Sequence, residues 1–415
     1  EFCQRLSQHS PVLHLARHWL EQHLVAQGLS IEQLVQLESQ NQAADQVSVS
    51  HSIASLRFPS AMDWKEFVET LSLVEQTLRS DPARVYGAMD FSTRDRYRHA
   101  VEALARHGYC SEAEVARLAI QLATDNAGKT DRDDRASHVG FYLIDKGLAK
   151  LGRLARVWWP WRTVIERSIH HFPLTFYAGG IGAMTLLITG GLAIQMWTRG
   201  VHGWILWTFL VVFLLCANQL AVALMNWLSM LLVKPSLLPR LDYTDGIAPE
   251  CRTMVVVPTM LTSADGVDRL LEKVEIHQLA NRDEHLHFAL LTDFRDAATE
   301  VMPEDEGLLQ RVSDGVANLN QKYPSANGSN FYLFHRPRRW NEGEGLWMGY
   351  ERKRGKLTEF NALLRGGSAD CFSAVVGDPS ILSSIKYVIT LDTDTQLPRD
   401  AARQLVGTMA HILNR

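Results

Sequence analysis

The sequence lacks the cysteine patterns that mark disulfide-rich domains and structural zinc sites. Only five of its 415 residues are cysteine, and no two of them form a Cys-x-x-Cys pair. An odd number of scattered cysteines argues against a disulfide framework and a zinc site, and indicates that the soluble parts occupy a reducing compartment.

An excess of basic residues is also missing. The formal net charge is −4, so nucleic acid is not an expected partner. Hydrophobic residues make up 46% of the chain and charged residues 21%, which excludes a disordered, collagen-like or low-complexity protein. The sequence has neither an initiator methionine nor a signal-peptide pattern, and it ends inside or just after a predicted helix. We therefore expect a piece of a longer protein.

Charge is absent from two long stretches in the middle of the chain. No Asp, Glu, Lys or Arg lies between Arg167 and Arg199, or between Arg199 and Lys234. A helix needs about 20 apolar residues to cross the hydrocarbon core of a bilayer. Segments 172–197 and 204–233 satisfy this length, and the turn between them is short. The region 155–235 is therefore predicted to contain a transmembrane hairpin.

Basic residues around this hairpin are distributed unevenly. The turn holds only Arg199, whereas the flanks hold Lys150, Arg153, Arg156, Arg162, Arg167, Lys234 and Arg240. The positive-inside rule then places both flanks in the cytoplasm. The second span also carries three uncharged polar residues, Asn218, Gln219 and Asn226. We expect these to form hydrogen bonds with further spans.

The first 154 residues predict an all-α domain used for packing or partner contact. Helix-start patterns recur in this region, and each precedes an apolar series at helical spacing. They occur at Ser30–Gln33, Asp63–Glu66, Ser92–Asp95 and Ser111–Glu114.

Residues 247–415 alternate between predicted strands and helices. The strands are predicted at 254–257, 287–291, 331–334 and 387–391, and the helices at 264–279, 305–322, 356–364 and 399–413. This alternation is typical of an α/β domain with a mostly parallel sheet. Ligands of such sheets bind at the carboxyl ends of the strands.

Two aspartates directly follow the last of these strands. Strand alternation would place Asp392 and Asp394 on one face, with Thr393 on the other. Two carboxylates on one face can hold Mg²⁺ or Mn²⁺, and such ions usually also bind substrate phosphates. The alternative is that one of them merely caps a helix.

Lys356 and Asn361 fall in a short predicted helix. A cation at a helix start opposes the helix dipole, which makes sense if an anion docks there, with Gly355 allowing close approach. The alternative is a solvated basic loop. Upstream, Arg336, Arg338 and Arg339 either reach a diphosphate or lie on the surface.

Asp293 ends the second predicted strand. A carboxylate there can accept a hydrogen bond from a nucleobase or ribose. Asp is also a common turn residue. The histidines, His335 and His277 among them, show no metal-ligand spacing and are interpreted as structural.

Three longer motifs carry a resemblance. They are Thr-Met-Val-Val-Val-Pro-Thr at 253–259, Arg-Gly-Lys-Leu-Thr-Glu-Phe-Asn at 354–361 and Val-Ile-Thr-Leu-Asp-Thr-Asp-Thr-Gln-Leu-Pro-Arg-Asp at 388–400. With segments 85–90, 97–99 and 138–147 of the helical block, they resemble bacterial cyclic β-1,2-glucan synthases, glycosyltransferase family 84. The resemblance covers nearly the whole chain.

The resemblance implies a multi-pass enzyme of the bacterial inner membrane with its helical and transferase domains in the cytoplasm. It would build β-1,2-linked glucan from UDP-glucose, using a GT-A-like, Rossmann-type domain of which residues 247–415 form the N-terminal half. Asp392 and Asp394 would bind the metal, and Asp293, Lys356, Asn361 and Thr259 the donor substrate.

An inverting transfer also needs a general base for the acceptor hydroxyl. No convincing base lies between Asp394 and Arg415, so it is expected further along the protein. Two alternatives remain. The Asp-x-Asp-x-Thr pattern also fits haloacid-dehalogenase-like phosphatases, with Asp392 as nucleophile and Asp394 as acid. A non-enzymatic membrane scaffold would have no affinity for UDP or metal.

Overall fold

The computed structural model describes residues 14–26, 28, 30–127, 135–160, 164, 168–169, 172–232, 235, 237–325 and 328–415. Several positions used in the predictions lie outside the described residues, namely Cys3, Arg162, Arg167, Val233 and Lys234. Contacts group the chain into two units, Glu1–Glu75 and Gln76–Arg415.

The described part of the first unit is helical. Its helices are α2 (His14–Val25), α3 (Ile31–Ala61), α4 (Trp64–Leu71) and the start of α5 (Leu73–Leu78). The capping box at Ser30 is confirmed, because Ser30 and Gln33 each accept a hydrogen bond from the other's backbone N–H at 3.1 Å. Asp63 likewise caps α4 by accepting from the backbone N–H of Glu66 at 3.3 Å.

The second unit begins with more helices. They are η2 (Tyr86–Ala88), α6 (Phe91–Arg106), α7 (Glu112–Ala127), η3 (Arg135–Ser137), α8 (Gly140–Ile144) and α9 (Leu148–Leu154). The capping box at Ser111 is confirmed by the 2.7 Å bond from its N–H to Glu114. The prediction at Ser92 is wrong, because Asp90 caps α6 by accepting from the N–H of Thr93 at 3.0 Å.

Segments that carry the resemblance meet in the core of this helical block. Asp81 accepts from Nδ1 of His138 at 2.8 Å, and the Tyr97 hydroxyl lies 3.2 Å from Nε2 of the same ring. All three side chains are buried. Burial alone would raise the pKa of Asp81, but its interactions with His138 and its hydrogen bonds from the backbone of Val139 and Tyr86 together lower that pKa. These residues therefore stabilise the packing of the block.

Two long apolar helices follow, α11 (Pro173–Thr198) and α12 (Trp204–Leu232). By length and composition, both are able to cross a membrane. Within this pair, Asn226 accepts from the hydroxyl of Tyr177 at 2.7 Å. One of the three polar residues thus finds a partner inside the hairpin itself.

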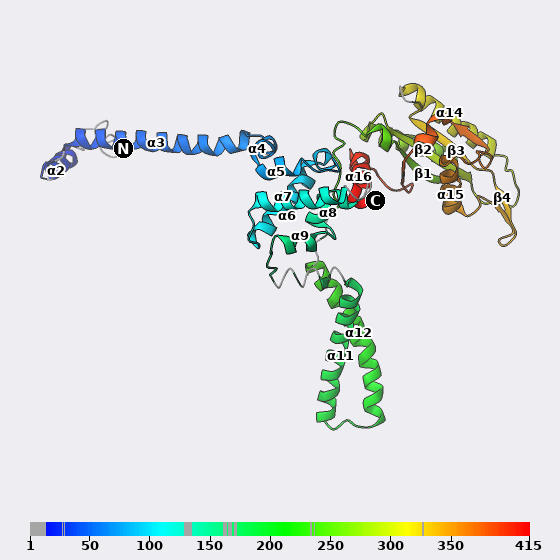
Figure 1. The fold of residues 1–415 in the computed structure, drawn as a ribbon, viewed down its shortest axis with the longest axis horizontal. Coiled ribbons are helices and arrows are strands. Elements are labelled where there is room, and N and C mark those ends of the chain that lie inside the picture. The colour runs from blue at the N-terminus through cyan, green and yellow to red at the C-terminus, as the bar shows by residue number, and fades with distance from the viewer. Residues whose placement is uncertain are drawn as a thin grey trace. The chain divides into compact units, whose positions relative to one another are not determined.

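The C-terminal half is an α/β domain built on a five-stranded sheet (Figure 1). Its strands are β1 (Thr253–Leu261), β2 (Leu286–Phe294), β3 (Phe331–His335), β6 (Ala374–Val376) and β7 (Tyr387–Thr390), in the order β6-β3-β2-β1-β7. The strands pair in parallel except β6, which is antiparallel to β3. A separate hairpin joins β4 (Arg339–Asn341) and β5 (Leu346–Met348).

Helices cover both faces of the sheet. They are α13 (Ala264–Ala280), α14 (Asp305–Lys322), α15 (Arg352–Leu364) and α16 (Ala401–Ala410), with short turns η4 (Pro249–Cys251), η5 (Pro379–Ser384) and η6 (Ile412–Asn414). Successive β1 residues point to opposite faces. Val255 packs in the core with α13, α14 and α16, whereas Val256 packs in the core with α15 and η5. The predicted α/β architecture is confirmed.

The chain order creates a switch point beside β1. Strands β2 and β3 follow on one side of it, and β7 returns on the other. In open parallel sheets, the crevice at such a point is where ligands bind, outside the carboxyl ends of the strands. The candidate site is therefore expected at the carboxyl ends of β1 and its neighbours.

Candidate functional site

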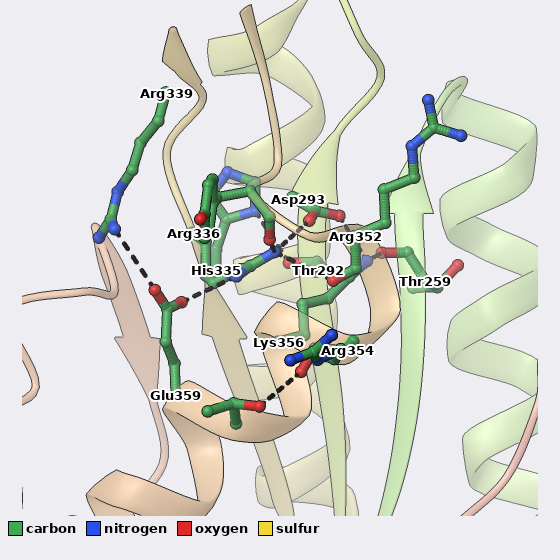
Figure 2. A network of polar contacts seen from close by, with 12 residues as sticks. Thr259, Thr292, Asp293, His335, Arg336, Arg339, Arg352, Arg354, Lys356 and Glu359 are labelled. Atoms are coloured by element: carbon green, nitrogen blue, oxygen red, sulfur yellow. Dashed lines mark hydrogen bonds and ion pairs between the residues drawn. The ribbon is translucent and has the colours of Figure 1, made fainter. Parts of the chain in front are cut away.

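The structure brings together three of the predicted site residues at this edge of the sheet. Thr259 and Asp293 lie near the carboxyl ends of β1 and β2, and Lys356 projects from α15. The ammonium group of Lys356 donates to the backbone oxygen of Thr259 and forms an ion pair with Oδ1 of Asp293 (Figure 2). Lys356 is 3% exposed and Asp293 is 1% exposed.

A second buried cation completes this arrangement. Arg336, which follows β3, donates from Nη2 to Oδ2 of Asp293 at 2.8 Å and from Nη1 to Glu359 at 2.8 Å (Figure 2). Both oxygens of Asp293 therefore already accept from a cation. Burial lowers the pKa of Lys356, and the charge of Asp293 opposes this shift.

His335 lies next to this cluster. Its Nδ1 is 2.8 Å from the hydroxyl of Thr292, and its Nε2 has no hydrogen-bond partner within the described part of the chain. Burial lowers the pKa of His335 to about 4. The ring is therefore neutral at physiological pH, which agrees with the prediction that His335 is a structural residue.

The structure corrects the geometry of the aspartate pair. Strand β7 ends at Thr390, and the backbone N–H of Thr395 bonds to the oxygen of Asp392 at 3.0 Å. Asp392 and Asp394 thus lie in a turn beyond the strand, where strand alternation does not fix their faces. Both are exposed, and Asp392 forms an ion pair with Lys353.

The chemistry of this pair is compatible with the predicted divalent ion. Exposed carboxylates are ligands that Mg²⁺ and Mn²⁺ accept, and Mg²⁺ commonly takes only one or two of them, together with waters and substrate phosphates. Among the described residues, no group of three or more His, Cys, Asp or Glu side chains is placed to hold a metal. The donor set of this turn fits an ion that is shared with a substrate.

The prediction that Lys356 opens its helix is wrong. Helix α15 begins at Arg352, preceded by Glu351 in a left-handed conformation with φ of 50°. Lys356 therefore lies in the second turn, where buried Asp293 balances its charge. The cations at the helix start are instead Arg352, Lys353 and Arg354, paired with Asp296, Asp392 and Glu351.

Of the remaining predicted residues, Arg339 approaches the Asp293 cluster through Glu359, whereas Asn361 and Arg338 lie elsewhere. Asn361 is exposed in the last turns of α15. Arg338 is buried and binds Asp305 at the start of α14, so it does not face a ligand. Arg339 is about half exposed and lies 3.4 Å from Glu359.

Sequence reasoning missed the parts played by Arg336, Lys353 and Glu359. A signal for two of them was available, because Lys353, Lys356 and Glu359 are spaced three residues apart and so share a helix face. Arg336 carried no comparable signal, since its partners are distant in sequence.

Comparison with known proteins adds a relationship over almost the entire chain. No protein-family model matches it. It is 34% identical over 399 residues to the curated "Cyclic beta-(1,2)-glucan synthase NdvB" of Rhizobium meliloti (strain 1021). The alignment covers 96% of this chain, which spans 14% of the length of that relative. The resemblance indicated by the motifs is thus confirmed: this chain is related to one region of a cyclic beta-(1,2)-glucan synthase.

Proposed function

We propose that this chain is the donor-binding part of a membrane glycosyltransferase that builds β-1,2-glucan from UDP-glucose. The observation that carries the proposal is the 34% identity to a cyclic beta-(1,2)-glucan synthase over 96% of the chain. The α/β domain supports the proposal, because it has a switch point beside β1, and nucleotides bind at such switch points in open parallel sheets. We identify this domain with the N-terminal half of a GT-A-like fold.

The chemistry of the site residues fits this role. Asp392 and Asp394 would hold Mg²⁺ or Mn²⁺, which supplies charge neutralisation for a departing diphosphate. The exposed cation of Lys353 lies beside Asp392, and we assign it to the diphosphate as a second source of positive charge. Both carboxylate oxygens of Asp293 already accept hydrogen bonds, one from Arg336 and one from Lys356. We therefore assign Asp293 to positioning Lys356 at the end of β2 and not to direct contact with the nucleotide.

The proposal extends to the partners of the enzyme. The growing glucan is the acceptor, and a general base must deprotonate its 2-hydroxyl group. We assign no residue of this chain to that step. The helices α11 and α12 would cross the bacterial inner membrane, with the α/β domain on the cytoplasmic side, where UDP-glucose is available.

The test is the substitution Asp394→Asn in the full-length protein, with glucose transfer from UDP-glucose as the readout. We expect transfer to be abolished and metal-dependent UDP binding to weaken, because a divalent ion loses one of two charged ligands. The protein should stay folded, since Asp394 is exposed in a turn. Asp400→Asn, an exposed carboxylate in the same loop region, is the matched control and should retain activity.

Other results would favour the alternatives. Phosphate-ester hydrolysis that is lost in Asp392→Asn, without glucose transfer by the unsubstituted protein, would indicate a phosphatase. Full transfer activity in Asp394→Asn would show that the aspartates only shape the turn. Absence of both UDP and metal binding would indicate a scaffold.

A further inference from the structure

Arg336 is a buried cation that ties three separate segments together. It is 3% exposed. Its Nη2 donates to Asp293 in β2 and to the backbone oxygens of Tyr350 and Arg352, at 2.8, 3.1 and 3.2 Å. Its Nη1 donates to Glu359 in α15 at 2.8 Å. One guanidinium group therefore holds both the start and the second turn of α15 against the sheet (Figure 2).

Only arginine can make this set of contacts. Its planar fork offers five N–H donors in fixed directions, whereas a lysine ammonium is a single point of charge. The helix start also packs directly on the guanidinium, because a Cβ added at Gly355 would lie 2.9 Å from Nη1 of Arg336 and would collide with the backbone oxygen of Tyr350. A side chain at position 355 would therefore force Arg336 or the backbone of Tyr350 to move.

The turn that Arg336 holds carries the exposed cation of the proposed site. Arg352 supplies one of the bound oxygens, and the next residue, Lys353, forms the ion pair with Asp392. One turn later, Lys356 binds the carboxyl ends of β1 and β2. A shift of the helix start would therefore move Lys353 relative to the aspartate turn.

We propose that Arg336 is a positioning residue for the donor substrate. It acts through the start of α15, which places Lys353 and Lys356 at the carboxyl edge of the sheet. This inference rests on the function proposed above. Preorganised charges bind a ligand without the cost of ordering themselves first, so the loss of Arg336 should weaken donor binding.

Arg338 provides a matched control two residues away. It is 4% exposed and makes an equally buried set of contacts, with the carboxylate of Asp305 and the backbone oxygens of Arg295 and Glu300. These contacts hold the start of α14 rather than that of α15. The two arginines therefore share burial and bonding but differ in the helix that they position.

The experiment compares Arg336→Lys with Arg338→Lys in the full-length protein, measuring KM for UDP-glucose, kcat and melting temperature. We expect Arg336→Lys to raise KM about tenfold and to change kcat less than about threefold. Arg338→Lys should lower the melting temperature and leave KM unchanged. Loss of folded protein alone reduces the number of active molecules, which lowers apparent kcat and does not change KM.

A second variant covers the case in which Arg336→Lys does not accumulate. Glu359→Gln loosens the same contact from the helix side while keeping an acceptor, and should raise KM about threefold. An unchanged KM in Arg336→Lys would overturn the inference about Arg336 but not the proposed function. If Arg336→Lys does not accumulate, an unchanged KM in Glu359→Gln would have the same meaning. The same holds if Arg338→Lys raises KM equally. Absence of UDP-glucose turnover in the unsubstituted protein would overturn the proposed function, and this inference with it.

Discussion

The charged groups at the carboxyl edge are paired with one another, and Asp293, Arg336 and Lys356 are buried. Asp293 and Glu359 supply two carboxylates, and Arg336 and Lys356 supply two cations. Taking a charge out of water is tolerated when it is paired and hydrogen-bonded, and removing one partner of a buried pair typically costs about 3–5 kcal/mol. An unpaired charge added among the buried members of this set would therefore be costly.

His335 is the group that would add such a charge at acidic pH. Its folded-state pKa of about 4 lies below the ordinary value of 6.5, so the folded protein favours the neutral ring. This stability is fully present above about pH 6.5 and is lost as pH falls toward 4, because the unfolded chain takes up the proton first. At pH 5 the loss from this residue is about 2 kcal/mol.

The substitution His335→Gln removes this titration. We expect the difference in melting temperature between pH 7 and pH 5 to become smaller than in the unsubstituted protein, measured on both proteins in the same detergent. Some pH dependence should remain, since burial also lowers the pKa of His287 to about 4. An unchanged difference would show that His335 does not contribute to acid sensitivity.

At this scale, the sequence indicated which side chains converge but not which charges neutralise one another. Asp293 was expected at the carboxyl edge because it ends a predicted strand, whereas Lys356 was placed in the donor site only by the resemblance. Their direct pairing depends on the rotation of α15 about its axis, which the spacing of residues does not determine. The contribution of Arg336 depends on the same rotation.

Among the elements, α15 shows how packing overrides local signals. It lacks a side-chain cap, and its first turn carries three basic residues that oppose the helix dipole. Ion pairs to neighbouring loops offset this cost. The predicted helix start, Lys356, lies four residues after the observed one, Arg352.

Gly355 makes this packing testable. An alanine in a helix is normally favoured over glycine by about 1 kcal/mol. At Gly355 the added Cβ would collide with the backbone oxygen of Tyr350, so we expect Gly355→Ala to lower the melting temperature and raise KM for UDP-glucose.

The control is the same substitution in the first turn of α14. A Cβ at Gly307 meets nothing within 4 Å, so Gly307→Ala should preserve or increase stability. Equal effects of the two substitutions would mean that α15 does not pack as closely on Tyr350 as the structure shows.

The shortest elements had no signal in the sequence. Strands β4, β5 and β6 have three residues each, too few for a recognisable alternation of side chains. The four parallel strands, by contrast, are predominantly apolar and were all predicted, although β1 and β2 run four and three residues further than expected at their carboxyl ends. Burial on both faces explains why these strands were easier to recognise.

At the scale of the whole molecule, the sequence identified the order of helical block, apolar hairpin and α/β domain. Helix α11 begins and ends one residue later than its predicted segment, and α12 ends one residue earlier than its predicted segment. Their orientation in a membrane follows from charge bias and not from internal packing. For that reason, it stays a prediction that the structure does not test.

The exposed surface of the hairpin supports a membrane location. Large apolar side chains such as Leu187 and Leu215 are 77% and 65% exposed, and an apolar surface of this extent is costly in water. Trp204 and Trp207, near the turn, are 77% and 70% exposed, as expected for residues at a membrane interface.

Cysteine labelling tests the predicted orientation. The turn carries one basic residue, Arg199, whereas the flank before α11 carries several, so the positive-inside rule places the turn outside the cytoplasm. In spheroplasts, His202→Cys should react with a membrane-impermeant maleimide. Asp245→Cys, an exposed position before the α/β domain, should react only after the membrane is disrupted. The unsubstituted protein sets the background from the native cysteines. Labelling of position 245 but not of 202 in spheroplasts would reverse the orientation and place the proposed donor site on the side of the membrane that lacks UDP-glucose.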